Sequence, residues 1–193
     1  MDSEQRRRYQ TMMLSTYCPE TSFLDKFVMR DGTEKWRCSQ QVSHGANILA
    51  SVHGGKVFIV NSRKRNGLIL FKPYHAEFAG PGAVVGGDCD SDCQFVLPIG
   101  NLSLLDAESY EDRQKAYLIR RQWIRLIKQI TENSVSSQRV QKILDQFEQY
   151  FPADVVADLP DVAFAMLVGV LPQTVAIVRR LGSDLDDYMN NHQ

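Results

Sequence analysis

The sequence predicts an α+β protein in which a β-rich first part is followed by an all-helical second part. Nearly all of the 12 glycines precede residue 106, where short apolar runs alternate with clusters of turn-forming residues. After residue 106, apolar residues recur at alternating steps of three and four, which is the period of an amphipathic α-helix. With 193 residues, 44% of them apolar, the chain can bury the core of one large domain or two small ones.

The glycine-rich part is expected to form a small β-barrel or β-roll. Strand-forming residues are grouped at 56–60 (KVFIV), 68–71 (LILF) and 95–97, and turn residues separate them. The pair Asn66-Gly67 can take the positive φ values that a tight connection between antiparallel strands needs. We therefore predict that 56–60 and 68–71 pair as a β-hairpin.

A long amphipathic helix is predicted from Ser109 to Ile130. Ser109 and Asp112 stand three residues apart, as in a helix-capping box. The apolar stripe of this helix consists of Ala116, Ile119, Trp123, Leu126 and Ile130. Its other faces are rich in arginine and lysine, which is typical of a solvated helix surface. The stripe is coiled-coil-like but covers only about two heptads, so it serves either self-association or packing within the chain.

Several shorter helices are expected after a polar break at 131–137. The pattern predicts helices at 138–150, from Ala153 and at 161–168, then a turn at 169–171 and a last helix that begins at Pro172. Together they would form a compact helical module.

The stretch AFAMLVGVLPQTVAIVRRL at 163–181 fits a helix-turn-helix. Ala165 provides the small residue that is needed where two helices cross, and Gly169 can take a positive φ in the turn. Val175 and Val178 are placed to fix the angle of the second helix. A plain αα-hairpin tolerates the same residues, so the pattern alone leaves both arrangements open.

The segment AMLVGVLPQTV, from Ala165 to Val175, resembles the helix-turn-helix of Crp/Fnr-type transcription regulators. The preceding elements are similar in order: a cyclic-nucleotide-binding-like β-roll, a last strand at LSLLD (102–106) and a long helix. The resemblance implies a β-roll sensor-like domain at 1–108, a connecting and dimerisation helix at 109–135 and a helix-turn-helix domain at 136–193. It also implies a homodimer, for which the candidate contact residues are Ile119, Trp123, Leu126 and Ile130.

The resemblance further implies DNA contacts from the last helix. The candidate residues are Gln173, Thr174, Arg179 and Arg180. Glutamine can bond an adenine edge, threonine a phosphate or a thymine methyl group, and arginine a phosphate or guanine. Residues 136–193 contain four basic and eight acidic residues, which opposes phosphate binding by this segment alone. The basic patches Arg63-Lys64-Arg65 or Arg120-Arg121-Arg125 would then supply phosphate contacts.

The chain departs from the Crp/Fnr pattern in two places. The segment GPGAVVGGDCDSDCQF (80–95) has neither the glutamate nor the arginine with which family members hold a cyclic nucleotide. We therefore expect no cyclic-nucleotide effector. Twelve residues follow Leu181, too few for the family's usual β-hairpin wing.

Cys89 and Cys93 lie in an aspartate-rich segment that begins like a calcium-binding loop. Such a loop needs glycine at its sixth position, where this chain has Cys93, so an EF-hand is not expected. The cysteines are interpreted as surface thiols without a role, as a reversible thiol switch, or as ligands of a metal or an iron–sulfur cluster. Further ligands would come from Cys18, Cys38, His44 or His75. We predict no cofactor, with a metal or iron–sulfur cluster as the alternative.

The sequence contains no recognisable motif for nucleophilic catalysis, phosphate cradling or zinc hydrolysis, so we expect no enzyme. It also contains no apolar run of the ~20 residues that a bilayer span needs and no signal-peptide pattern, so a cytoplasmic protein without a membrane partner is expected. The predicted function is DNA-binding transcription regulation, with DNA, a second copy and a protein of the transcription machinery as partners. The alternatives are a non-enzymatic protein-interaction module and a cysteine-based redox or metal sensor.

Overall fold

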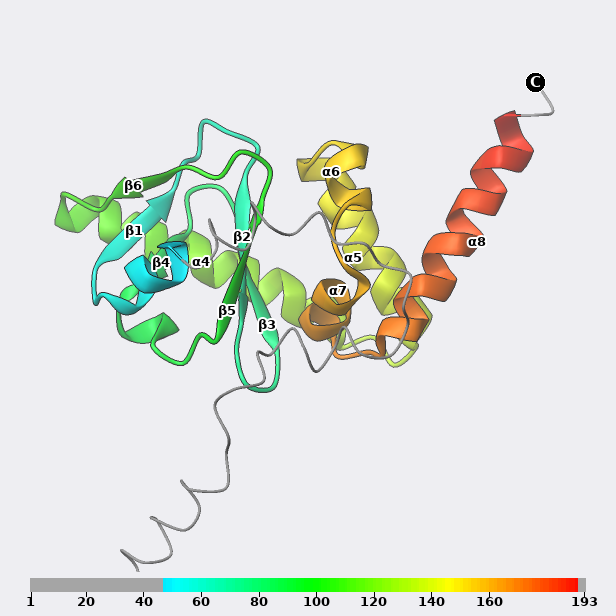
Figure 1. Ribbon diagram of the computed structural model, residues 1–193, viewed down its shortest axis with the longest axis horizontal. Helices are drawn as coiled ribbons and strands as arrows, with labels where there is room; N and C mark the ends of the chain where they lie inside the picture. The colour runs from blue at the N-terminus through cyan, green and yellow to red at the C-terminus, as the bar shows by residue number, and fades with distance from the viewer. Residues whose placement is uncertain (1–46, 191–193) are drawn as a thin grey trace, which may run out of the picture. The chain divides into compact units, whose positions relative to one another are not determined.

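The structure, a computed structural model, describes residues 47–190 and the side chains of residues 47–182. All of these residues belong to one compact unit, Cys38–Gln193. The described part is α+β, as the sequence predicts: strands occupy its first part and helices dominate the second (Figure 1).

The strands form two small antiparallel sheets rather than a closed barrel. One sheet has the strand order β4-β1-β6, with strands Val84–Gly86, Val57–Val60 and Leu104–Asp106. The other has the order β3-β2-β5, with strands Ala76–Ala79, Gly67–Phe71 and Phe95–Ile99. Residues 47–53 form a short helix before β1, and a 3-10 helix, η1 (Gly87–Asp90), follows β4.

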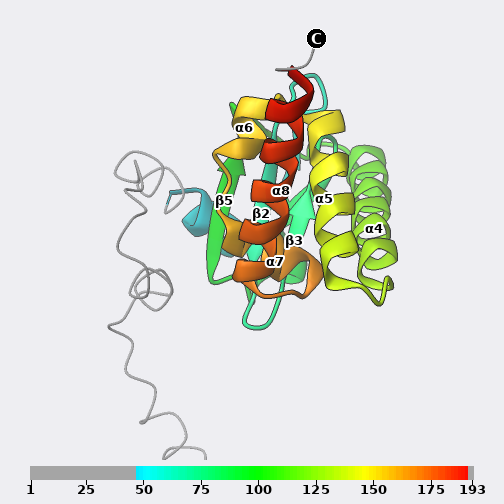
Figure 2. The same ribbon diagram turned by 90° about the vertical axis from the view of Figure 1, so that its right-hand side faces the viewer.

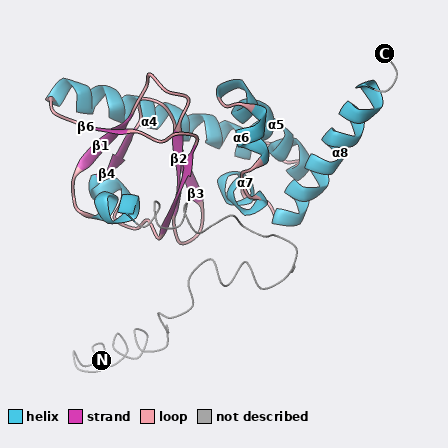
Figure 3. Cartoon of the chain, turned by 45° about the horizontal axis from the view of Figure 1, so that its top comes forward, coloured by secondary structure: helices cyan, strands magenta, loops and turns pink. Residues whose placement is uncertain are grey.

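The sheet β3-β2-β5 is covered on both faces, which explains why every residue of β2 is buried. Leu68 and Leu70 contribute to an apolar core with Val60 and Val85 of the other sheet. Phe78 pairs with Ile69 across the ladder and packs against aromatic rings of the helical part. The sheet therefore forms a middle layer between the sheet β4-β1-β6 and the C-terminal helices (Figures 1 and 3).

The prediction that residues 56–60 and 68–71 pair as a β-hairpin is wrong. Strand β1 pairs with β4 and β6, whereas β2 pairs with β3 and β5. Gly67 is not among the residues with positive φ. Its role is close packing, because a Cβ at this position would lie 2.5 Å from Cε2 of Phe78. The side chain of Asn66 is buried and its Nδ2 donates to the carbonyl oxygen of Asn61 at 3.3 Å.

The long predicted helix is present as α4 (Tyr110–Thr131). Ser109 is its N-cap, as expected: its Oγ accepts a hydrogen bond from the backbone N–H of Asp112 at 3.0 Å. The same hydroxyl donates to Oδ2 of Asp112 at 2.6 Å. This exchange satisfies one of the N–H groups that a helix start leaves unpaired.

Four helices follow α4. They are α5 (Ser136–Tyr150), α6 (Ala153–Ala157), α7 (Asp161–Val168) and α8 (Pro172–Asn190). Proline stands at the N-cap of α6 and of α7 and at the first position of α8, where a missing N–H costs no hydrogen bond. Among residues 47–190, no single helix is long and apolar enough to cross a bilayer; only the sharply bent pair of α7 and residues 172–182 reaches that hydropathy jointly.

An aromatic cluster joins the β part to the helical part. The ring of Phe78 lies 4.9 Å from Trp123 of α4 and 4.9 Å from Phe147 of α5, centroid to centroid. Phe147 in turn lies 5.1 Å from Phe164 of α7. These rings bury apolar surface of the β part and of the helical part against each other. The expected boundaries at residues 108 and 135 therefore do not coincide with a gap in packing.

Candidate functional site

The helices α7 and α8 meet at a sharp angle. The axis of α7 and that of residues 172–182 are inclined by 114°. Gly169 ends α7 with φ 64° and ψ 53°, and the N–H of Val170 donates to the carbonyl oxygen of Ala165 at 3.0 Å. Glycine adopts this left-handed conformation without the penalty that a Cβ brings. The angle and the three-residue turn lie in the range of helix-turn-helix motifs.

One side of α8 packs against the chain and the other faces solvent. Val175 is fully buried and Val178 is 8% exposed, and the contacts of this side are with α5 and α7. Gln173, Ile177 and Arg180 lie on the exposed side, at steps of four and three residues. The buried valines fix the direction of the helix, so the exposed side chains project from a rigid support.

Arg179, which the sequence suggested as a DNA contact, is used within the chain. Its Nη2 donates to the carbonyl oxygen of Val156 at 3.1 Å, and its Nη1 to that of Ala157 at 3.4 Å. Nη1 also lies 3.2 Å from Oδ1 of Asp161, and the guanidinium sits 5.0 Å from the ring centroid of Phe164. Arg179 therefore links α8 to the end of α6 and the start of α7.

The other three candidate DNA contacts have different surroundings. Gln173 and Arg180 are exposed, and Thr174 is partly buried. The backbone N–H of Thr174 donates to the carbonyl oxygen of Leu171 at 2.9 Å, as expected in the first turn of a helix. The exposed polar groups are therefore concentrated on Gln173 near the start of α8 and on Arg180 two turns later.

Arg139 of α5 is a residue that the sequence reasoning missed. Its Nη1 donates to the carbonyl oxygens of Val168 and Gly169, both at 3.1 Å. These carbonyls stand at the end of α7, where a helix leaves acceptors unpaired. Arg139 therefore holds the turn between α7 and α8 against α5. No spacing signal in the sequence distinguishes it from a solvated arginine.

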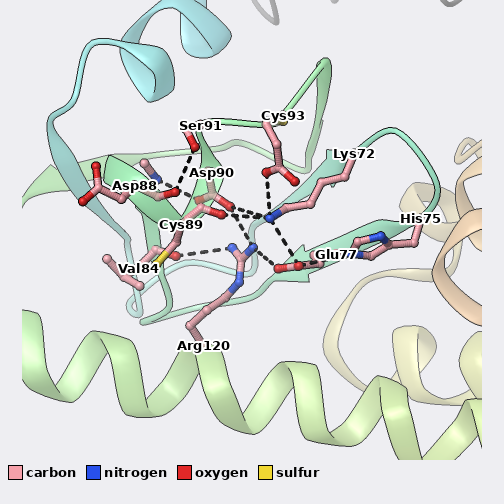
Figure 4. Close-up of polar contacts among 12 residues, drawn as sticks. Lys72, His75, Glu77, Val84, Asp88, Cys89, Asp90, Ser91, Cys93 and Arg120 are labelled. Atoms are coloured by element: carbon pink, nitrogen blue, oxygen red, sulfur yellow. Dashed lines mark hydrogen bonds and ion pairs between the residues drawn. The ribbon is translucent and has the colours of Figure 1, made fainter. Parts of the chain in front are cut away.

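A second candidate site is a group of charges between α4 and the sheets, which we call the charge cluster. It consists of Lys72, Glu77, Asp90 and Arg120 (Figure 4), together with Asp92, which pairs with Lys72. Arg120 donates from Nη2 to Oε2 of Glu77 at 2.6 Å and to Oδ1 of Asp90 at 3.2 Å. Its Nη1 donates to the carbonyl oxygen of Val84 at 3.3 Å. One side chain thus ties α4 to β3, β4 and η1.

Lys72 completes the charge cluster from the end of β2. Its Nζ donates to the carbonyl oxygen of Cys89 at 2.8 Å and lies 3.0 Å from Oδ1 of Asp92 and 3.4 Å from Oε1 of Glu77. Asp90 also accepts from the backbone N–H of Gly86 at 2.9 Å through Oδ2. The calcium-loop-like aspartates Asp90 and Asp92 therefore face a lysine ammonium of the same chain.

The charge cluster perturbs the titration of its members. Burial alone would raise the pKa of Glu77, but the hydrogen bond and charge of Arg120 and the charge of Lys72 outweigh it, so the pKa is lowered. Burial would lower the pKa of Lys72, but Asp92, Glu77 and Asp90 raise it overall. Both shifts favour the charged forms, so the cluster is a mutually stabilised set of ions.

A cavity of about 730 Å³ lies beside the charge cluster and α4. Its walls include Tyr117, Leu118 and Ile124 of α4 together with both buried cations of the cluster. The two buried cations, Lys72 and Arg120, are matched by three carboxylates. Arg121, which also lines the cavity, is exposed and belongs to no described ion pair.

The two cysteines differ in accessibility. Cys89 is exposed, whereas Cys93 is buried and its Sγ donates to the carbonyl oxygen of Phe95 at 3.2 Å. Burial and the charge of Asp90 raise the pKa of Cys93 to about 11, so this thiol stays protonated at neutral pH. Within residues 47–190 no three His, Cys, Asp or Glu side chains are grouped as a metal site would require.

The remaining candidate ligands add little to a metal site. The Nε2 of His75 lies 3.3 Å from Oε1 of Glu77, and its side chain is largely exposed. Cys18, Cys38 and His44 lie outside the described residues. A thiol switch, and a metal or iron–sulfur site completed by these residues, stay predictions from the sequence.

The stripe of α4 that was expected to hold a dimer lies against the chain itself. Ile119 and Trp123 pack on the core between the sheets, and a Cβ on Gly80 would overlap the indole of Trp123. Ile130 is buried and Leu126 is partly buried. The stripe therefore packs at least partly within the chain, and a dimer through these four residues stays a prediction.

Comparison of the chain with protein-family models, with curated protein sequences and with solved structures finds no significant match. Function is therefore inferred from the pair of helices α7 and α8, which we call the α7–α8 unit, and from the exposed side chains of α8.

Proposed function

We propose that this protein is a DNA-binding transcription regulator of Crp/Fnr-like architecture that is not gated by a cyclic nucleotide. The observation that carries the proposal is the 114° crossing of α7 and α8 around a left-handed glycine. In helix-turn-helix proteins this crossing lets the second helix enter the major groove while the first helix crosses the DNA backbone. The fold of a β part followed by a long helix supports the same architecture.

The exposed side of α8 supplies the chemistry for reading DNA. Gln173 is the second residue of α8, and recognition helices contact base edges with their N-terminal residues. A glutamine amide can bond N6 and N7 of adenine together. Arg180 lies two turns further along the same side and can bond a phosphate or a guanine. Thr174 contributes a hydroxyl for a phosphate next to Gln173.

Arg179 has a positioning role in this proposal instead of a contact role. Its guanidinium bonds the last two carbonyls of α6 and pairs with Asp161 at the start of α7. Loss of these contacts would change the angle at which α8 is held. The two adjacent arginines therefore have separable functions.

The test is a DNA-binding assay with single variants of the full chain. A preferred sequence is first selected from random duplexes with the wild-type protein. We expect Gln173→Ala to lower affinity for that sequence by about 1–3 kcal/mol without affecting random duplex. Arg180→Ala and Arg179→Ala should both weaken binding, and Arg179→Ala should lower the unfolding temperature more, because it removes the hydrogen bonds to Val156 and Ala157. The proposal would be contradicted if no preferred sequence is selected, or if all three variants bind the selected sequence with the affinity of the wild type.

A second candidate function, protein binding by the same scaffold, is favoured by three exposed apolar side chains. Leu171, Ile177 and Leu181 are 69%, 57% and 58% exposed and lie at or along α8. Apolar side chains on a helix surface are the usual anchors of a helix-mediated protein interface. This candidate predicts no duplex binding at about 50 mM salt. It also predicts a protein partner that Ile177→Asp releases while the fold is retained.

A further inference from the structure

The exposed surface of α4 carries a row of cations that the packing of the protein does not use. Arg121, Arg125 and Lys128 are exposed and follow one another at steps of four and three residues, so they share one side of the helix. Between residues 113 and 131, α4 contains no acidic residue. We call these three residues the basic stripe.

The cations of the basic stripe have no ionic partner among the described residues. Every described ion pair of α4 is made by Arg120, which points into the charge cluster. The basic patch suggested from the sequence included Arg120. In the structure Arg120 is buried in the charge cluster, and the exposed cations of the stripe are Arg121, Arg125 and Lys128. Three unpaired exposed cations in a row raise the local positive potential, which attracts a polyanion.

Helix α5 connects the end of the basic stripe to the proposed recognition helix. Helix α4 ends at Thr131, and α5 begins five residues later at Ser136. Arg139, in the first turn of α5, bonds the carbonyls of Val168 and Gly169, at the end of α7. Helices α4, α5 and α8 stand side by side, with α5 in contact with both others (Figure 2). The last residue of the stripe, Lys128, thus stands at the end of α4 that adjoins this unit.

The spacing of the stripe suits a nucleic-acid backbone. Seven residues separate Arg121 from Lys128, which is about 10.5 Å along an α-helix. Along the axis of duplex DNA, each strand carries one phosphate about every 3.4 Å, so the stripe spans about three phosphates. A symmetry-related copy of the same face would instead place cations opposite cations, which costs energy. The charge pattern therefore favours a phosphate backbone over a second copy.

We infer that Arg121, Arg125 and Lys128 bind the phosphate backbone of duplex DNA and supply the contacts that the acidic C-terminal segment lacks. This inference rests on the proposed function and assigns a surface to it. The stripe adds affinity without sequence preference, because phosphate contacts position a protein and do not read bases. Sequence preference stays with Gln173 and Arg180.

The experiment compares two triple variants of the full chain. Arg121→Gln with Arg125→Gln and Lys128→Gln removes the stripe. Lys56→Gln with Arg113→Gln and Lys115→Gln is the matched control, since it removes three exposed cations that belong to neither basic patch. Binding of a random-sequence duplex is measured by fluorescence anisotropy between about 50 and 200 mM salt. Circular dichroism checks that both variants keep their helix content.

The salt dependence gives the decisive result. Each lost phosphate contact lowers the slope of log affinity against log salt by about 1, so the stripe variant should lose about three units of slope and the control variant none. An unchanged slope in the stripe variant, or an equal loss in both, overturns the inference. If the wild type retains its selected sequence in that case, the proposed function stands without the stripe.

Two further outcomes also overturn the inference and identify another occupant. If the stripe variant differs from the wild type in oligomeric mass by sedimentation velocity, while the slope of log affinity against log salt is unchanged, the surface binds a second copy of the chain. Wild-type binding to vesicles that contain phosphatidylserine, together with no binding to any duplex, assigns it to an anionic membrane and rejects the proposed function as well.

Discussion

Arg120 has a larger expected effect on stability than any other arginine of α4, because it is buried between two carboxylates. Replacing it with methionine leaves Glu77 and Asp90 without their main cation. Removing one partner of a buried ion pair typically costs about 3–5 kcal/mol. We expect Arg120→Met to lower the free energy of unfolding by this amount in urea titration. The control is Arg121→Met, since the neighbouring side chain is exposed and should change stability by at most about 0.5 kcal/mol. Equal stabilities of the two variants would contradict the burial of Arg120.

The lowered pKa of Glu77 predicts that the folded protein loses stability in acid. Its pKa in the folded state is lowered from 4.5, so its contribution to stability is complete above about pH 4.5 and is lost as the pH falls through the folded pKa. The wild type should therefore lose more stability than Glu77→Gln between about pH 5 and 3. Urea titrations across this range measure the difference. A Glu77→Gln variant with the same acid-dependent loss as the wild type would show that another carboxyl controls it.

Asp161 acts in the opposite direction. Burial raises its pKa above 3.8 even though Arg179 and Arg180 lower it, so its ionised form is disfavoured in the folded chain. Its contribution to stability is therefore present at low pH and is lost as the pH rises through the folded pKa. The contribution of Asp161 to stability partly offsets that of Glu77 in acid, so the comparison with Glu77→Gln must keep Asp161 unchanged.

At the scale of the elements, the turn between α7 and α8 depends on the backbone of Gly169. A residue with a Cβ pays about 1–2 kcal/mol in the left-handed conformation. Space is not limiting, because a Cβ there would meet only Nη1 of Arg139 at 3.7 Å. Gly169→Ala should therefore destabilise the protein by about 1 kcal/mol in thermal or urea unfolding. Gly182→Ala, a helical glycine with nothing within 4 Å of the new Cβ, is the matched control and should be neutral or slightly stabilising.

Helix positions were predictable because their signals are local. The capping pair Ser109 and Asp112 and the prolines at the starts of α6, α7 and α8 act on the residues next to them, and the structure has helices where these signals predict them. Strand pairing was not predictable, because it depends on residues distant in sequence. Asn66-Gly67 satisfies the local rule for a hairpin turn, yet Gly67 serves the packing of Phe78. The short strands β3 and β4 carry no clear alternation and were not predicted.

The candidate site was predictable in position but not in the role of each side chain. The glycine, the valines and the polar start of α8 follow from sequence spacing. The division of labour between Arg179 and Arg180 does not, because only the placement of Val156, Ala157 and Asp161 around one of them separates the two. The same is true of Arg120 and Arg121, where one residue of helix rotation decides between a buried ion and an exposed one.

At the scale of the whole molecule, the proposed DNA-binding function connects the exposed side of α8 with the basic stripe of α4. Reading is assigned to Gln173 and Arg180, and phosphate contact to the basic stripe. Arg139 and Arg179 hold α7 and α8 in place from opposite ends. The connection requires that the intact chain bind DNA despite the acidic residues of its C-terminal segment.

DNA binding by the intact chain is tested most directly by a salt titration of wild-type binding to a labelled duplex. We expect binding at about 50 mM salt and a steep loss of affinity by about 200 mM, with a log–log slope of about −3 or steeper. Binding to a selected sequence should be tighter than to random duplex. No binding at the lower salt concentration would contradict the proposed function and leave the exposed apolar residues of α8 as the basis for a protein partner.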